Sequence, residues 1–500
     1  MSQAIEISQP VRATLERLRG KYFVDGALAT PASGDAQATT DPATGEALTQ
    51  IARATAAEVD QAVRSARQTF EGDDWARMRP SHRQRLINRL ADLLEQNIDE
   101  LAELETLDNG KPFAMAKNAD VRGSIEYLRY VAGWATKIEG SVLDVSFPKP
   151  RGGGDYFGYT QRRPVGVVAA IVPWNFPLNM AVWKIGPALA TGCTVVLKPA
   201  SETPLTALRL AELIVEAGFP AGVVNVVTGS GSVIGDALTS HPLISKVTFT
   251  GSTEVGRHVG LQAMKNLNPS SLELGGKSPV IVFDDADIKS AIAGAASAIF
   301  FNQGETCTAG SRLYVQKSVY DEFIEGVAER GARMKIGHGM DPETRMGPLI
   351  SASHRASVLD YVQKGVSEGA KVISGGAAVD GPGYFMQPTV LASDTNDNVA
   401  VREEIFGPVL VAIPFDDEDH AVALANESEY GLAASVWSSN LHRVHRTVPR
   451  IDAGIVWVNC HNLLDPNLPF GGVKNSGIGR EMGKDVLDAY TEKKSVLMTV

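Results

Sequence analysis

Cys307 lies among small and polar residues in the segment 300–312, which reads FFNQGETCTAGSR. A structural cysteine is usually packed among apolar side chains, because the neutral thiol behaves as a small hydrophobe. A nucleophilic cysteine needs partial exposure, backbone N–H donors nearby and little bulk around the sulfur. Thr306, Thr308 and Gly310 leave that space. Cys307 is therefore a candidate nucleophile, although this segment alone fits a structural cysteine about equally well.

A thiolate that oxidises an aldehyde needs further groups. Its addition to the carbonyl creates an oxyanion that hydrogen-bond donors must stabilise, a hydride must leave to a cofactor, and a base must activate the water that hydrolyses the thioester. Asn175, in the segment PWNFP, is a candidate donor, although a lone Asn more often forms a turn. Glu273, in SLELGGK, is a candidate base rather than an ordinary surface residue, because apolar flanks raise the pKa of a carboxyl group.

Two glycine-rich turns are candidates for binding cofactor phosphates. The segment 249–256 reads FTGSTEVG and the segment 229–235 reads GSGSVIG. Backbone amides at such a turn could hold a pyrophosphate at a helix N-terminus. Neither turn fits the pattern GxGxxG, and a lone glycine-rich turn is often only a loop. Lys198 ends a predicted strand, where its ammonium suits a ribose or a phosphate, or simply solvent.

The composition limits the class of protein. A chain of 500 residues is too long for one core, so two or three domains are expected. The net charge of −11 argues against nucleic acid or an anionic membrane as the main partner. The three cysteines, Cys193, Cys307 and Cys460, do not suggest a disulfide framework. With no signal peptide visible at residues 1–6 and no apolar run of membrane-spanning length, we expect a soluble, cytoplasmic protein.

The elements that must position these residues follow from hydrophobic periodicity. It predicts helices over 56–70, 81–107 and 114–138. From residue 165 strands alternate with helices, with strands at 165–172, 194–197, 223–227 and 246–250 and a helix at 205–217. A second series of the same style has strands at 280–283, 313–315, 371–374, 409–414 and 455–459 and helices at 288–301 and from 319. The alternation predicts an α/β fold with doubly wound parallel sheets and ligands at the carboxyl ends of their strands.

Two further segments, 157–163 and 494–500, resemble strands without a local partner. Unpaired strands at a surface invite pairing with another subunit. A hairpin folded onto its own domain is an equally open interpretation.

Together these segments resemble the aldehyde dehydrogenase superfamily of hydrolytic, NAD(P)-dependent enzymes. The motifs that carry the resemblance are PWNFP at 173–177, FTGS at 249–252, ELGGK at 273–277, the Cys307 segment, EIFGP at 404–408 and PFGG at 469–472. The resemblance implies that Cys307 is the nucleophile and Glu273 the base of deacylation. It also implies an oxyanion hole from Asn175 and the backbone N–H of Cys307, with Lys184 and Glu481 in a proton relay.

The resemblance implies where the cofactor binds. Lys198 and Glu404 would hold the riboses, Phe406 would flank the nicotinamide ribose and Ser252 would contact the pyrophosphate. The further cofactor positions are Trp174, Ser201, Gly231, Gly251 and Gly275. NAD-preferring relatives often carry Glu where this chain has Ser201. The missing carboxylate removes repulsion of a 2′-phosphate, so NADP stays open while NAD is favoured. No metal is expected.

The resemblance also implies two Rossmann-like α/β domains and a small β oligomerisation flap. The cofactor-binding domain would span 1–142 and 165–275, the catalytic domain 276–484, and the oligomerisation strands 143–164 and 485–500. The flap favours subunit pairing of the two unpartnered segments, in a homo-oligomer that is a tetramer rather than a dimer.

Four apolar residues, Phe176, Met180, Trp183 and Phe470, suggest an aromatic-lined substrate tunnel, although such a stripe is more commonly core. Relatives that take carboxylate-bearing semialdehydes often place Arg at the position of Trp183. The loop 460–468, CHNLLDPNL, resembles that of phenylacetaldehyde dehydrogenases. We therefore expect an arylacetaldehyde or a medium-chain aliphatic aldehyde, with semialdehydes and betaine aldehyde as alternatives.

The sequence also leaves other functions open. A CoA-acylating dehydrogenase would share the thioester, but Glu273 argues against it because a hydrolytic base is needed only when water is the acceptor. A cysteine hydrolase would leave the glycine-rich turns without a role. A non-catalytic protein that retains the fold would not need the full set of catalytic groups.

Overall fold

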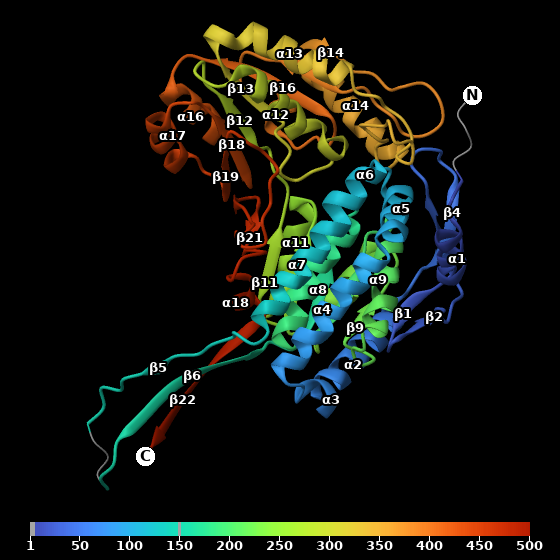
Figure 1. The fold of residues 1–500 in the computed structure, drawn as a ribbon, viewed down its shortest axis with the longest axis vertical. Coiled ribbons are helices and arrows are strands. Elements are labelled where there is room, and N and C mark those ends of the chain that lie inside the picture. The colour runs from blue at the N-terminus through green and yellow to red at the C-terminus, as the bar shows by residue number, and fades with distance from the viewer. Residues whose placement is uncertain (1–5, 149–151) are drawn as a thin grey trace.

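The chain folds around two large β-sheets, with a smaller three-stranded sheet that projects from the body (Figure 1). This computed structural model describes residues 6–148 and 152–500. The first residues of the predicted cofactor-binding segment and residues 149–151 of the predicted 143–164 segment lie outside the described residues. No helix in the described part is long and apolar enough to cross a membrane.

The first large sheet has eight strands in the order β2-β1-β9-β8-β7-β10-β11-β21. Its five central strands, β9 to β11 in that order, are parallel, and β1, β2 and β21 pair antiparallel at the two edges. The strands are β1 (Tyr22–Val24), β2 (Ala27–Ala29), β7 (Val167–Ile171), β8 (Thr194–Lys198), β9 (Val224–Val226), β10 (Lys246–Thr250), β11 (Ser270–Glu273) and β21 (Gly477–Ile478).

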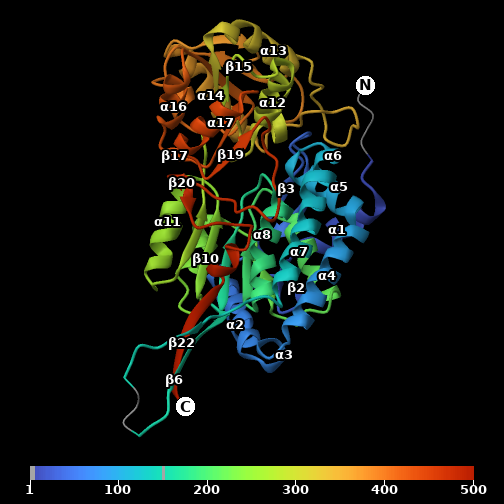
Figure 2. The same ribbon diagram turned by 60° about the vertical axis from the view of Figure 1, so that its left-hand side comes forward.

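Helices cover both faces of this sheet, and alternate residues of β7 show why. Val168 and Ala170 pack into one core cluster, while Val167, Ala169 and Ile171 pack into another. Figure 2 shows α11 on one side of the sheet and α7 and α8 on the other. The helices of this half are α1 (Gln9–Leu18), α2 (Ala56–Glu71), α3 (Asp73–Ala76), α4 (Pro80–Gln96), α5 (Ile98–Asn109), α7 (Arg122–Trp134), α8 (Pro177–Thr191), α9 (Leu205–Glu216), α10 (Asp236–Thr239) and α11 (Thr253–Met264). A sheet buried on both faces reads as continuous apolar runs, which is why these strands were predictable.

The second large sheet has seven strands in the order β14-β15-β16-β13-β12-β18-β19, parallel except for β14. The strands are β12 (Pro279–Val282), β13 (Arg312–Gln316), β14 (Lys371–Ser374), β15 (Thr389–Ala392), β16 (Val409–Phe415), β18 (Ala433–Trp437) and β19 (Ile455–Val458). Its helices are α12 (Ile288–Phe300), α13 (Tyr320–Ala332), α14 (Ala352–Ser367), α15 (Val399–Arg402), α16 (Glu418–Asn426) and α17 (Leu441–Thr447). Core clusters on both faces make this sheet doubly wound as well.

Two predicted helices are interrupted. The helix expected over 81–107 is two helices, α4 and α5, which meet at Asn97, where the side-chain Nδ2 donates 2.8 Å to the carbonyl of Leu93. Asparagine competes with the helix for backbone hydrogen bonds, so it marks the break. The helix expected over 114–138 is α6 (Phe113–Met115), a π-helical turn η1 (Ala116–Val121) and then α7.

The two segments predicted as strands without a local partner pair with each other. β6 (Tyr156–Pro164) runs antiparallel to β22 (Thr491–Thr499), and β5 (Val142–Leu143) adds a third strand. These strands form the projecting ribbon of Figures 1 and 2. The partner was hidden because 329 residues separate Arg162 from Thr491.

Candidate active site

A cavity of about 740 Å³ is lined by residues from both large sheets and their connecting loops. It collects most of the predicted site residues: Trp174, Asn175, Phe176, Met180, Trp183, Gly251, Ser252, Glu273, Gly275, Cys307, Glu404, Phe406 and Phe470. Parallel strands place ligands at their carboxyl ends, and several of these residues directly follow β7, β10 and β11. The predicted positions outside this lining are Lys184, Lys198, Ser201, Gly231 and Glu481.

Cys307 follows a tight turn, η3 (Phe301–Gly304). Within it Asn302 and Gln303 have φ of 49° and 57°, a left-handed conformation that is costly for residues with a side chain. At Gly304 a Cβ would lie 2.1 Å from the carbonyl oxygen of Gly407, so only glycine fits there. The turn thus carries the chain from the end of α12 to a cysteine that is partly exposed in the cavity.

The Cys307 thiol is protonated at neutral pH. Burial raises its pKa to about 12, the carboxylates of Glu404 and Glu273 add to the rise, and the backbone N–H groups of Thr308 and Cys307 oppose it. A thiol becomes nucleophilic only as the thiolate. Attack on a carbonyl therefore requires that the thiol first lose its proton.

Asn175, just beyond β7, is held from both ends. Its side-chain Nδ2 donates a 2.9 Å hydrogen bond to the main-chain carbonyl of Glu305. The main-chain carbonyl of Asn175 accepts from Asn302 Nδ2 at 3.0 Å and from Lys111 Nζ at 2.8 Å. A side-chain amide has two N–H donors, so the second can face a ligand. The amide is thus fixed in orientation with donor capacity to spare.

Lys111 is a site residue that the sequence reasoning missed. It is fully buried, its Nζ donates 2.8 Å to Asp120 of η1, and it lies 4.2 Å from the ring centroid of Phe176. The segment around it gave only a helix-break signal, since Gly110 ends α5 in the left-handed conformation. Nothing in the local sequence pattern indicates a buried ammonium here.

Glu273 is the last residue of β11 and only 3% exposed. Neither carboxylate oxygen has a hydrogen-bond partner among the described residues. A Cβ at Gly471 would lie 2.9 Å from Oε1, so that glycine leaves the carboxylate room. Burial raises the pKa of Glu273 well above its usual value; Glu481 raises it further, and Lys184 and Arg480 oppose the rise. When it is ionised, this carboxylate is a stronger base than an ordinary glutamate, which suits it to take a proton.

Lys184 and Glu481 form a buried ion pair with 2.5 Å between Nζ and Oε1. Thr248 Oγ1 donates to the same oxygen at 3.4 Å. The backbone of Glu481 exchanges two 2.7 Å hydrogen bonds with that of Phe470, which lines the cavity. The pair therefore lies behind the cavity wall and acts on Glu273 through its charges.

Glu404 sits against the glycines that follow Glu273. Its Oε1 accepts 2.8 Å from the N–H of Gly276, and a Cβ at Gly275 would lie 2.1 Å from Oε2. Burial raises the pKa of Glu404 to about 7. The Trp174 ring packs edge-on against Phe406 at 5.2 Å, and Phe406 has a φ of 56°. These contacts fix a carboxylate and two rings along one wall.

The remaining cofactor candidates lie at the carboxyl edge of the first sheet. Lys198 ends β8, and burial lowers its pKa to about 8. Ser201 Oγ donates 3.1 Å to the carbonyl of Gly229, and Gly231 begins the π-helical turn η2 (Gly231–Gly235). Ser252 caps α11 by accepting from the N–H of Val255 at 3.4 Å. A helix N-terminus suits phosphate oxygens, and a lysine ammonium at the same edge of the sheet suits phosphate or ribose oxygens.

The apolar candidates form one wall of the cavity. Trp183 and Phe470 pack edge-on at 5.1 Å between centroids, and Phe176 stacks on Phe301 at 6.1 Å. The loop after β19 adds Leu463 and Leu464, which are 65% and 47% exposed. The wall offers aromatic and aliphatic surface and suits an apolar ligand.

His461 contacts the main chain of Thr308, the residue after Cys307, and His354 lines the cavity with its Nε2 2.7 Å from the carbonyl of Phe406. The Nε2 of His461 lies 2.8 Å from the carbonyl of Thr308 and its Nδ1 lies 2.9 Å from Ser435 Oγ. Burial lowers its pKa to about 4. Both ring nitrogens are engaged, so His461 does not serve as the thiol base that a cysteine hydrolase would need. Among the described residues no group of three or more His, Cys, Asp or Glu side chains could hold a metal ion.

Known proteins resemble this chain over nearly its full length. A phenylacetaldehyde dehydrogenase of Pseudomonas fluorescens is 53% identical over 460 residues, which cover 92% of this chain and 91% of that protein. An NAD+ complex of an aldehyde dehydrogenase from Bacillus cereus matches with a TM-score of 0.96 and 45% identity over 100% of both chains. An indole-3-acetaldehyde dehydrogenase of P. syringae, solved as a mutant with NAD+ and IAA, matches with a TM-score of 0.93 and 42% identity over 98% of this chain and 99% of that one. The model of the aldehyde dehydrogenase family matches residues 29–496, and the chain belongs to that family.

Proposed function

We propose that this protein oxidises an apolar aldehyde, an arylacetaldehyde or a medium-chain aldehyde, to the carboxylic acid with NAD as cofactor. The observation that carries the proposal is that Cys307, Glu273 and Asn175 line one cavity together with Glu404 and Phe406. A nucleophile, a base, an oxyanion donor and cofactor contacts are thereby available to one bound substrate.

The reaction follows from these positions. Cys307 Sγ passes its proton to water and adds as the thiolate to the carbonyl carbon, and the oxyanion of the thiohemiacetal receives hydrogen bonds from Asn175 Nδ2 and the backbone N–H of Cys307. Bound NAD supplies the acceptor for the hydride that leaves this carbon, which becomes a thioester. Glu273 then takes a proton from water as the water attacks the thioester, the C–S bond breaks, and the acid and the thiol are released.

Lys184 and Glu481 act as a relay behind Glu273. Glu481 raises the pKa of Glu273 and Lys184 lowers it. The pair therefore influences the pH at which Glu273 gains and loses its proton. The relay thus contributes by tuning the pKa of Glu273.

The described residues fit a dinucleotide. Glu404, held above Gly275, would bind the nicotinamide ribose with Phe406 beside it, and Lys198 would bind the adenosine ribose. The pyrophosphate would lie at Ser252, and the other contacts would come from Trp174, Ser201, Gly231, Gly251 and Gly275. Ser201 places no negative charge beside a 2′-phosphate, so NADP remains open as a second cofactor.

The substrate class rests on the apolar wall of the cavity. Trp183 and Phe470 offer no cation for the carboxylate of a semialdehyde. The similar proteins from P. fluorescens and P. syringae are named for phenylacetaldehyde and indole-3-acetaldehyde, two arylacetaldehydes. Both considerations favour an apolar aldehyde over succinic semialdehyde or betaine aldehyde.

A steady-state screen tests the function. Phenylacetaldehyde, a medium-chain aliphatic aldehyde, succinic semialdehyde and betaine aldehyde are each assayed with NAD and with NADP, in the presence and absence of CoA. We expect the highest kcat/KM for an apolar aldehyde with NAD and no dependence on CoA. Faster turnover of the charged aldehydes, or acyl-CoA as the product, would contradict the proposal.

For the assembly we propose a homo-oligomer, a tetramer rather than a dimer, in the cytoplasm. β5, β6 and β22 form the ribbon that projects from the body, with exposed Leu143, Phe157 and Leu497 available for contact with other subunits. The oligomerisation strands would lie within 143–164 and 485–500. The cofactor-binding unit would comprise 1–142 and 165–275, and the catalytic unit 276–484. Light scattering of the purified protein gives the number of subunits directly.

A further inference from the structure

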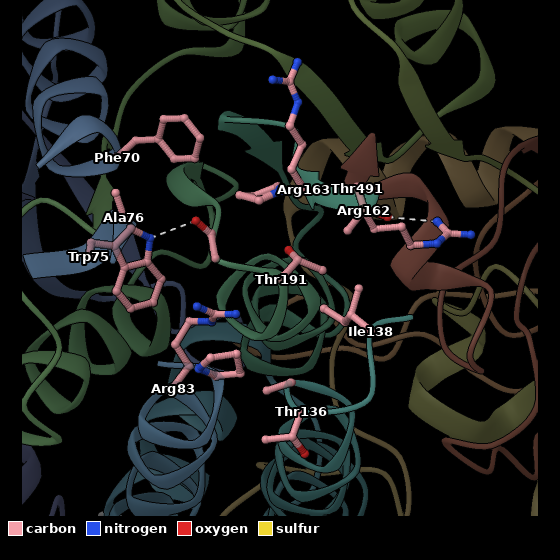
Figure 3. A pocket seen from close by; sticks show the side chains of 14 residues that line it. Phe70, Trp75, Ala76, Arg83, Thr136, Ile138, Arg162, Arg163, Thr191 and Thr491 are labelled. Carbon is pink, nitrogen blue, oxygen red and sulfur yellow. Dashed lines mark hydrogen bonds between the residues drawn. The ribbon is translucent and has the colours of Figure 1, made fainter. Parts of the chain in front are cut away.

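A second cavity, of about 410 Å³, lies at the root of the projecting ribbon and shares no lining residue with the cavity of Cys307 (Figure 3). Its walls come from the end of α2, the start of α4, the segment after α7, the end of α8 and the strands β6 and β22. Three of its lining residues are arginines, Arg83, Arg162 and Arg163, and none is Asp or Glu. A cavity with cations and no lining carboxylate is suited to an anion.

Arg162 and Arg163 are already neutralised. Arg162 pairs with Asp488 at 2.7 Å and donates 3.0 Å to Thr491 Oγ1, and Arg163 pairs with Glu492 at 3.1 Å. In Figure 3 the Arg163 guanidinium points away from the other lining side chains. These two arginines therefore contribute little free charge to the cavity.

Arg83 differs from both. In Figure 3 its guanidinium points from α4 toward Trp75 and Thr191. Its protein partners are carbonyls only, with Nε donating 3.3 Å to Ala190 and Nη1 donating 2.9 Å to Met78. No carboxylate in the described part of the chain forms an ion pair with it, and burial lowers its pKa. A partly buried guanidinium without an anion pays a desolvation cost that a bound anion would offset.

The other walls of the cavity are largely apolar. Phe70, Trp75, Pro80 and Ile138 line it, and the Trp75 Nε1 is already bound to the carbonyl of Gly192 at 2.9 Å. Ligand sites commonly enclose about 300–1,000 Å³ and combine apolar walls with a few polar groups. One free guanidinium matches one negative charge, and its planar fork matches a carboxylate. The apolar walls exclude a bare, strongly hydrated phosphate ion as the best ligand.

We propose that this cavity binds a small organic monocarboxylate, with the carboxylate on the Arg83 guanidinium and an aromatic or aliphatic body against Trp75 and Ile138. The acid that aldehyde oxidation would form belongs to this class, and in that respect alone the inference rests on the proposed function. A ligand there would also touch β6 and β22, the strands that carry the ribbon.

Isothermal titration of phenylacetate into the full-length protein tests the proposal. The wild type is compared with Arg83→Gln and with a matched control, Arg163→Gln, whose guanidinium lines the cavity but points away. Any binding at the cavity of Cys307 is common to all three proteins. We expect one more binding equivalent in the wild type and Arg163→Gln than in Arg83→Gln, and at least tenfold weaker binding of the neutral phenylacetamide at that site. Equal titrations for all three proteins would overturn the proposal.

Arg83 also holds two main-chain carbonyls, so a second variant guards against misfolding. Arg83→Lys keeps the charge and should retain phenylacetate binding with an affinity reduced several-fold. Trp75 supplies an independent signal, because phenylacetate should change tryptophan fluorescence more in the wild type than in Trp75→Phe, which keeps only the response of Trp174 and Trp183 at the other cavity. A fluorescence change as large in Trp75→Phe as in the wild type would contradict the placement. These measurements do not depend on aldehyde oxidation. The aldehyde screen tests the proposed function separately, so a failure of either claim can be distinguished from a failure of the other.

Discussion

The ammonium of Lys111 and the main-chain carbonyl of Asn175 are joined by a buried hydrogen bond of 2.8 Å. Asp120 neutralises this ammonium at 2.8 Å from within the π-helical turn η1. π-Helical turns are often found at functional sites. The orientation of the proposed oxyanion donor thus depends on a charged pair between the loop after α5 and η1, both far from Cys307 in sequence.

Replacing Lys111 by Met should disturb Asn175 without touching the cofactor contacts. We expect Lys111→Met to lower kcat by about 10- to 100-fold, because a misaligned oxyanion donor loses transition-state stabilisation. The affinity for NAD, measured by fluorescence titration, should change less than about threefold. The control is Lys117→Met in η1, which removes an ammonium paired with Asp99 at the surface. A kcat within twofold of the wild type would show that Lys111 does not position Asn175.

Removing the base should trap the acyl-enzyme. In Glu273→Gln the thioester forms but its hydrolysis slows, by about 100-fold or more, since general-base catalysis typically contributes that much. The expected result is a mass increase of one acyl group on the peptide that contains Cys307. The exposed carboxylate of Glu254, outside the cavity, gives the control Glu254→Gln, which should turn over normally. Normal turnover of Glu273→Gln would mean that another group activates the water.

The charge of Glu481 should set the pH dependence of the reaction. Glu273 must be ionised to accept a proton, and Glu481 raises its pKa while Lys184 lowers it. In Glu481→Gln the rise due to burial remains, but the contribution of Glu481 is lost and Lys184 loses its counter-ion, so the pKa of Glu273 falls. The ascending limb of the kcat–pH profile should move to lower pH. Glu126→Gln, which removes an exposed carboxylate at the cavity wall, should leave the limb in place.

The choice between cofactors should depend on position 201. Ser201→Glu puts a carboxylate where a 2′-phosphate would lie, and the two charges repel. We expect kcat/KM with NADP to fall by at least tenfold while that with NAD changes less than about threefold. Ser201→Gln, similar in size but uncharged, separates repulsion from crowding. Equal losses with both cofactors would place the 2′-position elsewhere.

The sequence allowed the sheets and the central site residues to be predicted, for a physical reason. Strands buried on both faces are continuous runs of apolar, often β-branched residues. The bounds of β7, β8 and β10 lie within two residues of the predicted ones. Cys307, Asn175 and Glu273 carry local signals of their own, in small or rigid neighbours. All three residues line one cavity.

What could not be predicted depends on contacts between distant segments. The pairing of β6 with β22 and the buried bond from Lys111 to Asn175 leave no local periodicity in the sequence. The helix breaks at Asn97 because its side chain competes for a backbone hydrogen bond. The hydrophobic periodicity of the sequence continues across this position, so it does not reveal the break. The lining around Arg83, which contains no carboxylate, likewise arises only when α4, α8 and the ribbon meet.

The central claim is that the sulfur of Cys307 carries the substrate. Its most direct test is alkylation with iodoacetamide, in which peptide mass mapping follows modification while NADH formation is measured. Cys460→Ser removes the other partly exposed thiol, and Cys193 is buried. Loss of activity should parallel modification of Cys307 one for one in both proteins. Undiminished aldehyde oxidation after complete modification of Cys307 would contradict the account.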